Sequence, residues 1–300
     1  MLKSNPLVSI VINCFNGEKY LKDALNSILN QSYQNWEIIF WDNQSTDHSA
    51  KIFNSFKDKR FKYYYASEHT FLYKARNEAI KRSSGDFIAF LDTDDFWEKD
   101  KLELQIPLFD DLKVAVVYGN HFILNETLNT KKVFLKRKKP RGFILDDLLK
   151  DYCTSLLTLV IRKSFLNNYD PPFNTSFHIM GDFDLMIRMS AKYKFDCVEK
   201  PIASWRVHGK NESLLKKRDQ IKELKNWSQN MKNYPIIFNN KNFENINNVI
   251  NNLEIKNLIL ENDFENAKLK LKKMPLSLKK IKYLMALFFP HYFVKRFIQF

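Results

Sequence analysis

Three acidic residues that could bind a divalent metal ion follow a short apolar run in the first third of the chain. The segment GDFIAFLDTDD places Asp92, Asp94 and Asp95 directly after the run 87–91. Like charges this close repel each other unless a cation or a network of donors holds them. Carboxylate oxygens suit Mg²⁺ or Mn²⁺, which keep several waters and bridge to substrate phosphates. Asp92 and Asp94 are therefore candidate metal ligands, and the alternative is that Asp94 or Asp95 caps a helix expected to start near Trp97.

Two other apolar runs also end in polar segments. Residues 7–12 are followed by NCFN at 13–16, and residues 36–41 are followed by DNQSTD at 42–47. Asp42 could accept hydrogen bonds from a base or a ribose, whereas Ser45 to Asp47 have the residue types of a turn and a helix N-cap. Lys74 and Arg76 could help to hold a diphosphate, or could belong to a solvated or carboxylate-paired helix face.

The elements that must position these residues alternate along the first half of the chain. Apolar runs rich in Val, Ile and aromatic residues predict strands, and apolar residues at helical spacing predict the helices between them. Such alternation is typical of an α/β fold with a mostly parallel, doubly wound sheet, in which ligands bind beyond the carboxyl ends of the strands. GxGxxG and GxxxxGK[ST] segments are absent from the sequence, which disfavours dinucleotide and P-loop sites. The expected strands are 7–12, 36–41, 61–66 and 87–91, and the expected helices are 17–30, 47–56 and 72–82.

The composition bounds the class of protein. The chain has 300 residues, of which 45% are hydrophobic and 27% charged, so it can form one large domain or a domain with an appendage. Its three cysteines are far apart and form no CxxC pair, so neither a disulfide framework nor a thiolate zinc site is expected. From the first residues we expect no secretory signal, and from the absence of an apolar run of about 18 residues we expect no membrane-spanning helix. We expect a cytoplasmic protein.

The positive charge is unevenly distributed. Residues 209–300 hold 18 Lys and Arg against 8 Asp and Glu, so they carry +10 of the net charge of +14. The βα alternation ends near residue 210, and a polar region with partial helical periodicity follows. Residues 268–300 contain nine basic and no acidic residues among many Leu and Phe. This composition suits a helix on an anionic membrane surface, and equally a helix that packs on the catalytic domain with solvated lysines.

The ordered segments of the first two thirds resemble family 2 glycosyltransferases with a GT-A fold. The resemblance covers residues 5 to 213 approximately and is carried by VSIVINCFNGEKYLKDALNSILNQSYQNWEIIFWDNQSTDHS, KARNEAIKRSSGDFIAFLDTDDFW, MGDFDLMIRM and SWRVHGKNES. It implies an inverting enzyme that uses a nucleotide-diphosphate sugar, most often a UDP-sugar, together with Mn²⁺ or Mg²⁺. The resemblance assigns the following residues to the nucleotide sugar: Asn13, Cys14, Phe15, Asn16, Asp42, Lys74, Arg76, Asp92, Thr93, Asp94 and Arg206.

The later motifs imply the remaining roles. Asp182 in GDFDL matches the family's general base, which takes a proton from the attacking acceptor hydroxyl. A capping role for Asp182 is the alternative from the pattern alone. In SWRVHGKNES, His208 is a further candidate for the metal and Arg206 for a phosphate, although single histidines are usually ordinary polar residues. The sequence departs from the family pattern at Asn13 and Cys14, at Asn43 and at Gly181, where Pro, Thr and two acidic residues are usual.

These inferences predict a catalytic domain at 1–210 and an α-helical region at 211–300. The expected function is transfer of one sugar to a hydroxyl of a saccharide or lipid-linked saccharide in surface glycan synthesis. The basic C-terminal segment would place such an enzyme peripherally at the inner face of the cytoplasmic membrane. A catalytically silent sugar-nucleotide-binding homologue is the first alternative, because of the departures from the pattern. A nucleic-acid-binding protein is the second, but the sequence lacks an RNA-binding motif, and the acidic edge would repel phosphate without a metal. We therefore expect no nucleic-acid partner.

Overall fold

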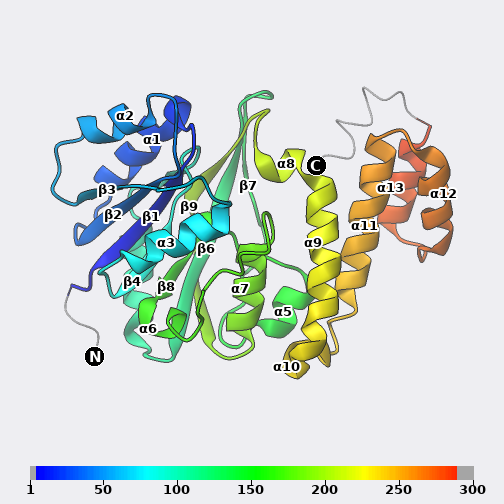
Figure 1. Cartoon of the computed structure of the whole chain (residues 1–300). Coiled ribbons are helices and arrows are strands. Elements are labelled where there is room, and N and C mark those ends of the chain that lie inside the picture. The colour runs from blue at the N-terminus through cyan, green and yellow to red at the C-terminus, as the bar shows by residue number, and fades with distance from the viewer. Residues whose placement is uncertain (1–4, 289–300) are drawn as a thin grey trace. The chain divides into compact units, whose positions relative to one another are not determined.

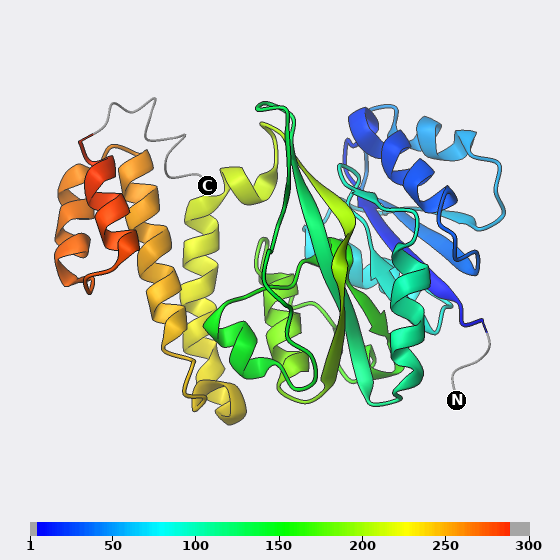
Figure 2. The same cartoon turned by 180° about the vertical axis from the view of Figure 1, so that it is seen from behind.

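The computed structural model describes residues 5–288 and divides by its internal contacts into two compact units, with the division between Asn211 and Glu212 (Figure 1). The first unit is an α/β domain built on one nine-stranded sheet, and the second is entirely helical in its described part. Seen from behind, the long strands of the first unit lie between helices on either side (Figure 2). The predicted α/β class and the predicted C-terminal helices are confirmed.

The N-terminal half of the sheet is parallel. Its strands have the order β3-β2-β1-β4, with β2 and β4 both pairing with β1 in parallel register. The bounds are β1 Val8–Cys14, β2 Trp36–Asp42, β3 Phe61–Tyr65 and β4 Phe87–Phe90. All seven residues of β2 are buried, and all but one of β1, as expected for strands covered on both faces by crossover helices. These crossovers are α1 Glu18–Leu29, α2 Ser49–Ser55 and α3 Leu72–Lys81.

The other half of the sheet is mixed, and sequence periodicity did not resolve it. β8 pairs antiparallel with both β4 and β6, whereas the long strands β6 and β9 pair in parallel. The bounds are β5 Phe96–Trp97, β6 Val114–Asn125, β7 Thr130–Val133, β8 Val160–Arg162 and β9 Lys194–Val207. Shorter helical segments lie between these strands: α4 Lys101–Gln105, η1 Ile106–Asp110, α5 Leu145–Lys150, η2 Leu156–Thr158, α6 Lys163–Leu166 and α7 Gly181–Ser190.

The prediction of a helix that starts near Trp97 is wrong. Residues Phe96–Trp97 form β5, which pairs antiparallel with β9, and the next helix begins only at Lys101. Asp95 is consequently no helix cap: it is buried and accepts a hydrogen bond from the backbone N–H of Arg206 at 2.9 Å. Pairing with β9, a strand more than 100 residues later, overrides the local signal for a helix. Through this pairing β9 lies next to the acidic segment.

The C-terminal unit consists of consecutive helices. They are α8 Glu212–Leu215, α9 Lys217–Asn230, η3 Met231–Asn233, α10 Pro235–Phe238, α11 Asn245–Leu260, α12 Phe264–Lys273 and α13 Leu278–Ala286. The last three share an apolar cluster to which α11 contributes Ile255 and Ile259, α12 contributes Ala267 and Leu271, and α13 contributes Tyr283. Among residues 5–288 no helix has the length and apolar character needed to cross a membrane. The predicted tail segment 268–300 is described only as far as residue 288.

Candidate active site at the carboxyl edge of the sheet

Three polar loops meet where the parallel strands end. β1 lies between β2 and β4, so the segments that follow Cys14, Asp42 and Phe90 lie at the same edge. The backbone N–H of Asn43 donates to the carbonyl of Cys14 at 2.8 Å, which joins the first two loops directly. A β-carbon added at Gly17 would lie 2.8 Å from Oγ1 of Thr93, so the first and third loops are also in contact. The sheet thus brings together the three loops that the sequence pattern selected.

The first loop is held by the second. Asn16 has a left-handed backbone with φ of 54°, its side-chain oxygen accepts from the N–H of Thr46 at 2.8 Å, and its own N–H donates to Oγ of Ser45 at 3.0 Å. Ser45 and Thr46 therefore fix this loop, and neither has the predicted helix-capping role. Asp47 does accept from the N–H of Ser49, the first residue of α2, at 2.9 Å.

Three residues of the first loop differ in what they expose to a ligand. Phe15 is 53% exposed, and its ring lies 4.3 Å from that of His69. The thiol of Cys14 is buried against Ser45, and burial raises its pKa. A contact between Cys14 and a nucleotide sugar would therefore involve the backbone of this residue. The side-chain amide of Asn13 is buried, and neither its oxygen nor its nitrogen has a hydrogen-bond partner in the described part of the chain. An unsatisfied buried amide of this kind is available to a ligand or to water.

Asp42 orders the second loop. Its side chain is 0% exposed, its Oδ1 accepts from the N–H of Ser45 at 2.8 Å, and its Oδ2 accepts from the hydroxyl of Tyr63 at 2.7 Å. A contact with a nucleobase would require these groups to move, so the predicted role in base binding is not visible in this arrangement. Burial and the bond to Asp42 raise the pKa of Tyr63.

Asn43, which replaces the family's acidic neighbour, has a structural explanation. Its amide donates to the carbonyl of Thr70 at 2.6 Å and accepts from the N–H of Thr70 at 3.2 Å. Its backbone carbonyl lies 2.9 Å from Nδ1 of His69. A carboxylate could not donate to the carbonyl of Thr70, so the amide is what fixes the segment that carries His69 against Phe15.

The acidic segment is surrounded by donors. Asp92 forms an ion pair with the buried guanidinium of Arg76 at 2.5 Å, and Oδ2 of Asp94 lies 3.0 Å from Nε2 of His208. Burial and the negative charge of Asp92 raise the pKa of Asp94, and burial raises that of Asp95 well above its usual value. The predicted cluster of Asp92, Asp94, Arg76 and His208 is thus brought together by α3, the loop after β4 and the end of β9.

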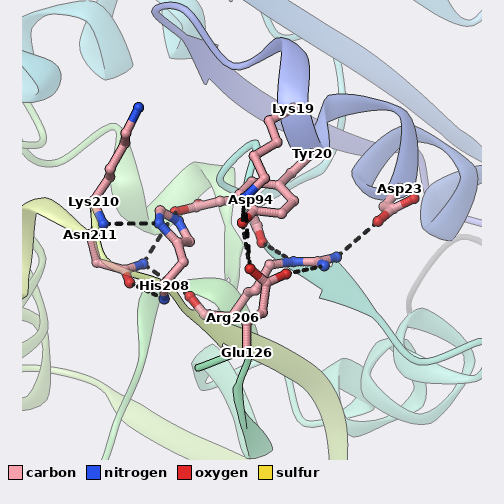
Figure 3. A network of polar contacts seen from close by, with 9 residues as sticks. All are labelled: Lys19, Tyr20, Asp23, Asp94, Glu126, Arg206, His208, Lys210 and Asn211. Atoms are coloured by element: carbon pink, nitrogen blue, oxygen red, sulfur yellow. Dashed lines mark hydrogen bonds and ion pairs between the residues drawn. The ribbon is translucent and has the colours of Figure 1, made fainter. Parts of the chain in front are cut away.

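Arg206 joins the end of β9 to three other segments through polar contacts (Figure 3). Its guanidinium donates to Asp23 on α1 and to Glu126 after β6, each at 3.0 Å, and to the backbone carbonyl of Asp94 at 3.0 Å. The hydroxyl of Tyr20 binds the other oxygen of Glu126 at 2.5 Å. The predicted phosphate contact of Arg206 would therefore compete with two carboxylates.

Lys74, unlike Arg76, is not brought to this cluster. Its ammonium is exposed and pairs with Glu68 at 2.9 Å, because it lies on the outer face of α3. Its predicted contact with the donor has no support in the arrangement of the side chains.

The residues present fit a divalent ion only in part. Two carboxylates, those of Asp92 and Asp94, suit Mg²⁺ or Mn²⁺ when phosphate oxygens and water supply the other ligands. His208 fits less well: its Nδ1 accepts from the backbone N–H of Lys210 at 3.2 Å, which leaves Nε2 to carry the proton donated to Asp94. Binding a metal through Nε2 would require that tautomer to change. Within residues 5–288 no group of three or more His, Cys, Asp or Glu side chains is arranged to hold a metal ion.

The candidate base lies at the start of α7. Oδ1 of Asp182 is 3.1 Å from the hydroxyl of Tyr73, and burial raises the pKa of Asp182 while the nearby charge of Arg76 opposes that rise. Met180 occupies the N-cap position of α7, so Asp182 lies in the first turn, where its carboxyl also accepts a hydrogen bond from the backbone N–H of Phe183. Asp184 instead forms the i, i+4 pair with Arg188 that its spacing indicates.

Sequence analysis missed Tyr73. Its only sequence signal is its position three residues before Arg76, which places both side chains on one face of α3. On that face Arg76 contacts Asp92 and Tyr73 contacts Asp182, so α3 links the acidic segment with the candidate base.

Comparison with known proteins decides the family. The sequence profile described as glycosyl transferase family 2 matches residues 9–168, more than half of the chain. The chain belongs to glycosyl transferase family 2. The matched range contains the three polar loops and α3, whereas Asp182, Arg206 and His208 lie beyond it.

Two curated members of glycosyl transferase family 2 illustrate the likeness. The chain is 35% identical over 167 residues to the Escherichia coli protein WfgD, a UDP-Glc:alpha-D-GlcNAc-diphosphoundecaprenol beta-1,3-glucosyltransferase, which covers 56% of this chain and 64% of WfgD. It is 32% identical over 165 residues to TuaG of Bacillus subtilis, a putative teichuronic acid biosynthesis glycosyltransferase, which covers 54% of this chain and 65% of TuaG. The chain therefore matches somewhat less than two thirds of the length of these relatives.

Solved structures with the same fold cover nearly the whole chain. The S. aureus protein TarS, in a crystal structure with UDP, superposes with a TM-score of 0.62 at 18% identity over 93% of this chain and 78% of that one. The mannosyltransferase PcManGT from Pyrobaculum calidifontis, solved with GDP-Man and Mn²⁺, gives a TM-score of 0.65 at 15% identity over 99% of this chain and 86% of that one. At these identities the likeness shows the fold, and the predicted GT-A fold is confirmed.

Proposed function

We propose that the chain transfers one sugar from a nucleotide-diphosphate sugar, with UDP-sugars the first candidates, to a hydroxyl of a saccharide or lipid-linked saccharide, with inversion at the anomeric carbon. The observation that carries the proposal is the pairing along α3: Arg76 contacts Asp92 of the acidic segment, and Tyr73 contacts Asp182. One face of a single helix thus links a group suited to the diphosphate with a group suited to the acceptor. The relatives WfgD and TuaG support glycan synthesis as the setting.

The proposed step needs one base and one stabilised leaving group. The acceptor oxygen forms a bond to the anomeric carbon as its proton passes to Asp182, and the bond from that carbon to the diphosphate breaks with its electron pair remaining on the diphosphate. Asp92 and Asp94 would hold a Mg²⁺ or Mn²⁺ ion, which supplies positive charge to the leaving diphosphate. Asn13, with its unsatisfied amide, and the exposed ring of Phe15 are the proposed contacts to the nucleoside.

The departures from the family pattern do not remove these groups. Asn43 fixes the segment around His69 and Thr70, and Gly181 leaves space for the ring of Tyr73. Neither change touches Asp92, Asp94 or Asp182. We therefore favour an active transferase over a silent sugar-nucleotide-binding homologue.

A thermal-shift panel tests the donor and the metal. UDP-, GDP-, dTDP- and CMP-sugars, each with Mn²⁺ and with EDTA, are added to the wild type and to Asp94→Ala. A ligand that binds the native state raises its melting temperature, so we expect a metal-dependent rise with one nucleotide class that is lost in Asp94→Ala. Asp111→Ala, an exposed carboxylate paired with Lys194, is the matched control and should keep the shift. Binding without release of nucleoside diphosphate to any acceptor favours the silent homologue, and the absence of any shift contradicts the proposal.

We also propose that the C-terminal unit binds an anionic membrane surface, at the cytoplasmic face where lipid-linked acceptors are presented. Helical spacing along α13 places an apolar stripe, which we call the α13 stripe, opposite the buried residues Tyr283 and Ala286, with Lys280 and Lys282 at its two borders. The stripe consists of Leu278, Ile281, Leu284 and Met285 on α13 and of Phe288 just after it, all exposed. Residues 268–288 contain no acidic side chain, so a second copy of this surface would be repelled, whereas anionic lipid would be attracted.

Vesicle flotation tests the membrane proposal. We expect the wild type to float with vesicles that contain phosphatidylglycerol, less so with purely zwitterionic vesicles or at high salt, and Ile281→Glu to remain in the soluble fraction. Ile236→Glu, which changes an exposed isoleucine on α10, is the matched control. Deletion of residues 276–300 should act like Ile281→Glu. Unchanged flotation of both variants would remove the support for this surface.

A further inference from the structure

Gly181 is the position where a side chain would displace Tyr73. A β-carbon built on Gly181 lies 2.6 Å from Cδ2 and from Cε2 of the Tyr73 ring, closer than non-bonded carbon atoms approach. Any side chain larger than hydrogen at this position would overlap Tyr73 where it stands. The absence of a side chain at residue 181 is therefore what admits the tyrosine beside Asp182.

The ring of Tyr73 is firmly placed. It is 2% exposed, it stacks on Phe173 with a centroid separation of 5.3 Å, and the guanidinium of Arg76 lies 5.3 Å from its centroid. Arg76 is held in turn by Asp92. The hydroxyl at the end of this ring consequently has a fixed position relative to the first turn of α7.

The hydroxyl of Tyr73 has one proton to donate and lies within hydrogen-bond distance of two acceptors. It lies 3.1 Å from Oδ1 of Asp182 and 3.0 Å from the backbone carbonyl of Ile179. When Asp182 is ionised, the phenol can donate to its carboxylate. When Asp182 is protonated, the phenol can donate to the carbonyl of Ile179 and accept from the carboxylic acid, so each state of Asp182 finds a partner.

Other charged and titratable groups near Asp182 come from two elements. Arg76 on α3 favours the ionised carboxylate through its charge, and burial opposes it. Tyr152, in the segment after α5, is buried, and the charge of Asp182 contributes to the rise of its pKa. The hydroxyl of Tyr152 has no hydrogen-bond partner within the described residues. The carboxyl of Asp182 is bound by the hydroxyl of Tyr73 and by the backbone N–H of Phe183, so Tyr73 is the side chain named here that binds it directly.

We propose that Tyr73 is a positioning residue for Asp182, which orients the carboxylate and gives it a hydrogen-bond partner both before and after it takes the acceptor's proton. The inference rests on the proposed role of Asp182 as general base. Tyr73 itself touches neither donor nor acceptor in this scheme. It acts through Asp182, and the missing side chain of Gly181 leaves the space that its ring occupies.

Tyr73→Phe keeps the ring and removes the hydroxyl, and the readout is the pH profile of kcat. Because the ionised carboxylate loses a donor, its pKa rises, so the acidic limb should move to higher pH by about one unit. We expect kcat near neutral pH to fall about tenfold while KM for the donor stays unchanged. Tyr193→Phe, which removes a surface hydroxyl bound to Asn168, is the matched control and should match the wild type. Wild-type kcat and an unmoved limb in Tyr73→Phe would overturn the inference.

If Tyr73→Phe fails to fold, a second variant at the same position tests the inference. Difluorotyrosine introduced at position 73 keeps the shape of the ring and is a stronger donor, so the acidic limb should move the opposite way, to lower pH; an unmoved limb contradicts the inference. Asp182→Asn separates this inference from the proposed function. If it retains kcat, the assignment of the base is wrong. If it abolishes kcat and neither change at Tyr73 moves the profile, only the role of Tyr73 is wrong.

Discussion

At the scale of single residues, the substitutions relative to the family pattern follow from contacts that only the neighbouring loops reveal. Asn43 supplies a donor that a carboxylate lacks, and Gly181 supplies space that a side chain would fill. Arg206 has the residue type of a phosphate ligand, yet Asp23 and Glu126 already hold it. Residue type and spacing thus indicate which chemistry is available, and the partners decide whether a side chain is free to perform it.

The contact between Gly181 and Tyr73 makes a residue-scale prediction. Gly181→Ala should lower the free energy of unfolding by about 1–3 kcal/mol, because the added methyl group overlaps the ring. In a Tyr73→Ala background the same change should cost much less, since the ring is gone. A double-mutant cycle by urea denaturation measures the coupling between the two sites. Additive effects of the two substitutions would show that the overlap is relieved elsewhere.

At the scale of elements, a buried carboxylate joins the first three strands to the turn before β4. Glu37 on β2 accepts from Oγ of Ser9 at 2.6 Å and from the N–H of Ser84 at 2.8 Å, and it also pairs with Lys62 on β3. Burial alone would raise its pKa, but these donors outweigh burial and hold the pKa at about 2. The parallel half of the sheet, which carries the site, is thereby fastened at the end opposite the polar loops.

This pairing makes stability depend on pH. The folded pKa of about 2 lies below the ordinary value of 4.5, so the ionised carboxylate stabilises the fold above about pH 4.5 and loses that effect as the pH falls toward 2. Glu37→Gln should lower the free energy of unfolding by about 2–3 kcal/mol at pH 7, with the difference from the wild type shrinking below pH 4.5. Denaturant titrations across this range measure it. Glu68→Gln, on an exposed pair with Lys74, is the control, and an equal, pH-independent loss in Glu37→Gln would contradict the explanation.

At the scale of the whole molecule, all the proposed donor and base residues lie in the first compact unit. The acidic segment, α3, α7 and the end of β9 precede Asn211, and the unit has its own apolar core around β1, β2 and β4. The second unit has a separate cluster formed by α11, α12 and α13. Binding of the nucleotide sugar and binding of a membrane surface are therefore assigned to different units.

Because donor binding is assigned to the first unit and membrane binding to the second, we predict that residues 1–211 fold and bind the nucleotide sugar on their own. The fragment should show the same metal-dependent thermal shift as the full chain, because it keeps every proposed ligand, and it should no longer float with anionic vesicles. Circular dichroism and the nucleotide-sugar panel measure the two properties. A soluble, folded fragment that has lost the shift would show that the second unit contributes to donor binding.

The sequence by itself determined the parallel half of the fold and the residues that gather at its edge. The apolar runs of β1 and β2, the helical spacing of apolar residues between the strands and the acidic segment after β4 are all local sequence patterns. Parallel strands then bring their carboxyl ends to one edge of the sheet. What the tertiary structure decided depends on partners distant in sequence. The pairing of β5 with β9 replaces an expected helix. The guanidinium of Arg206 is bound by carboxylates 80 and 183 positions away in the sequence, and the hydroxyl of Tyr73 binds Asp182, which lies 109 positions later. Contacts of this range leave no periodic trace in a single sequence, because only the packed sheet and helices bring the two segments into contact.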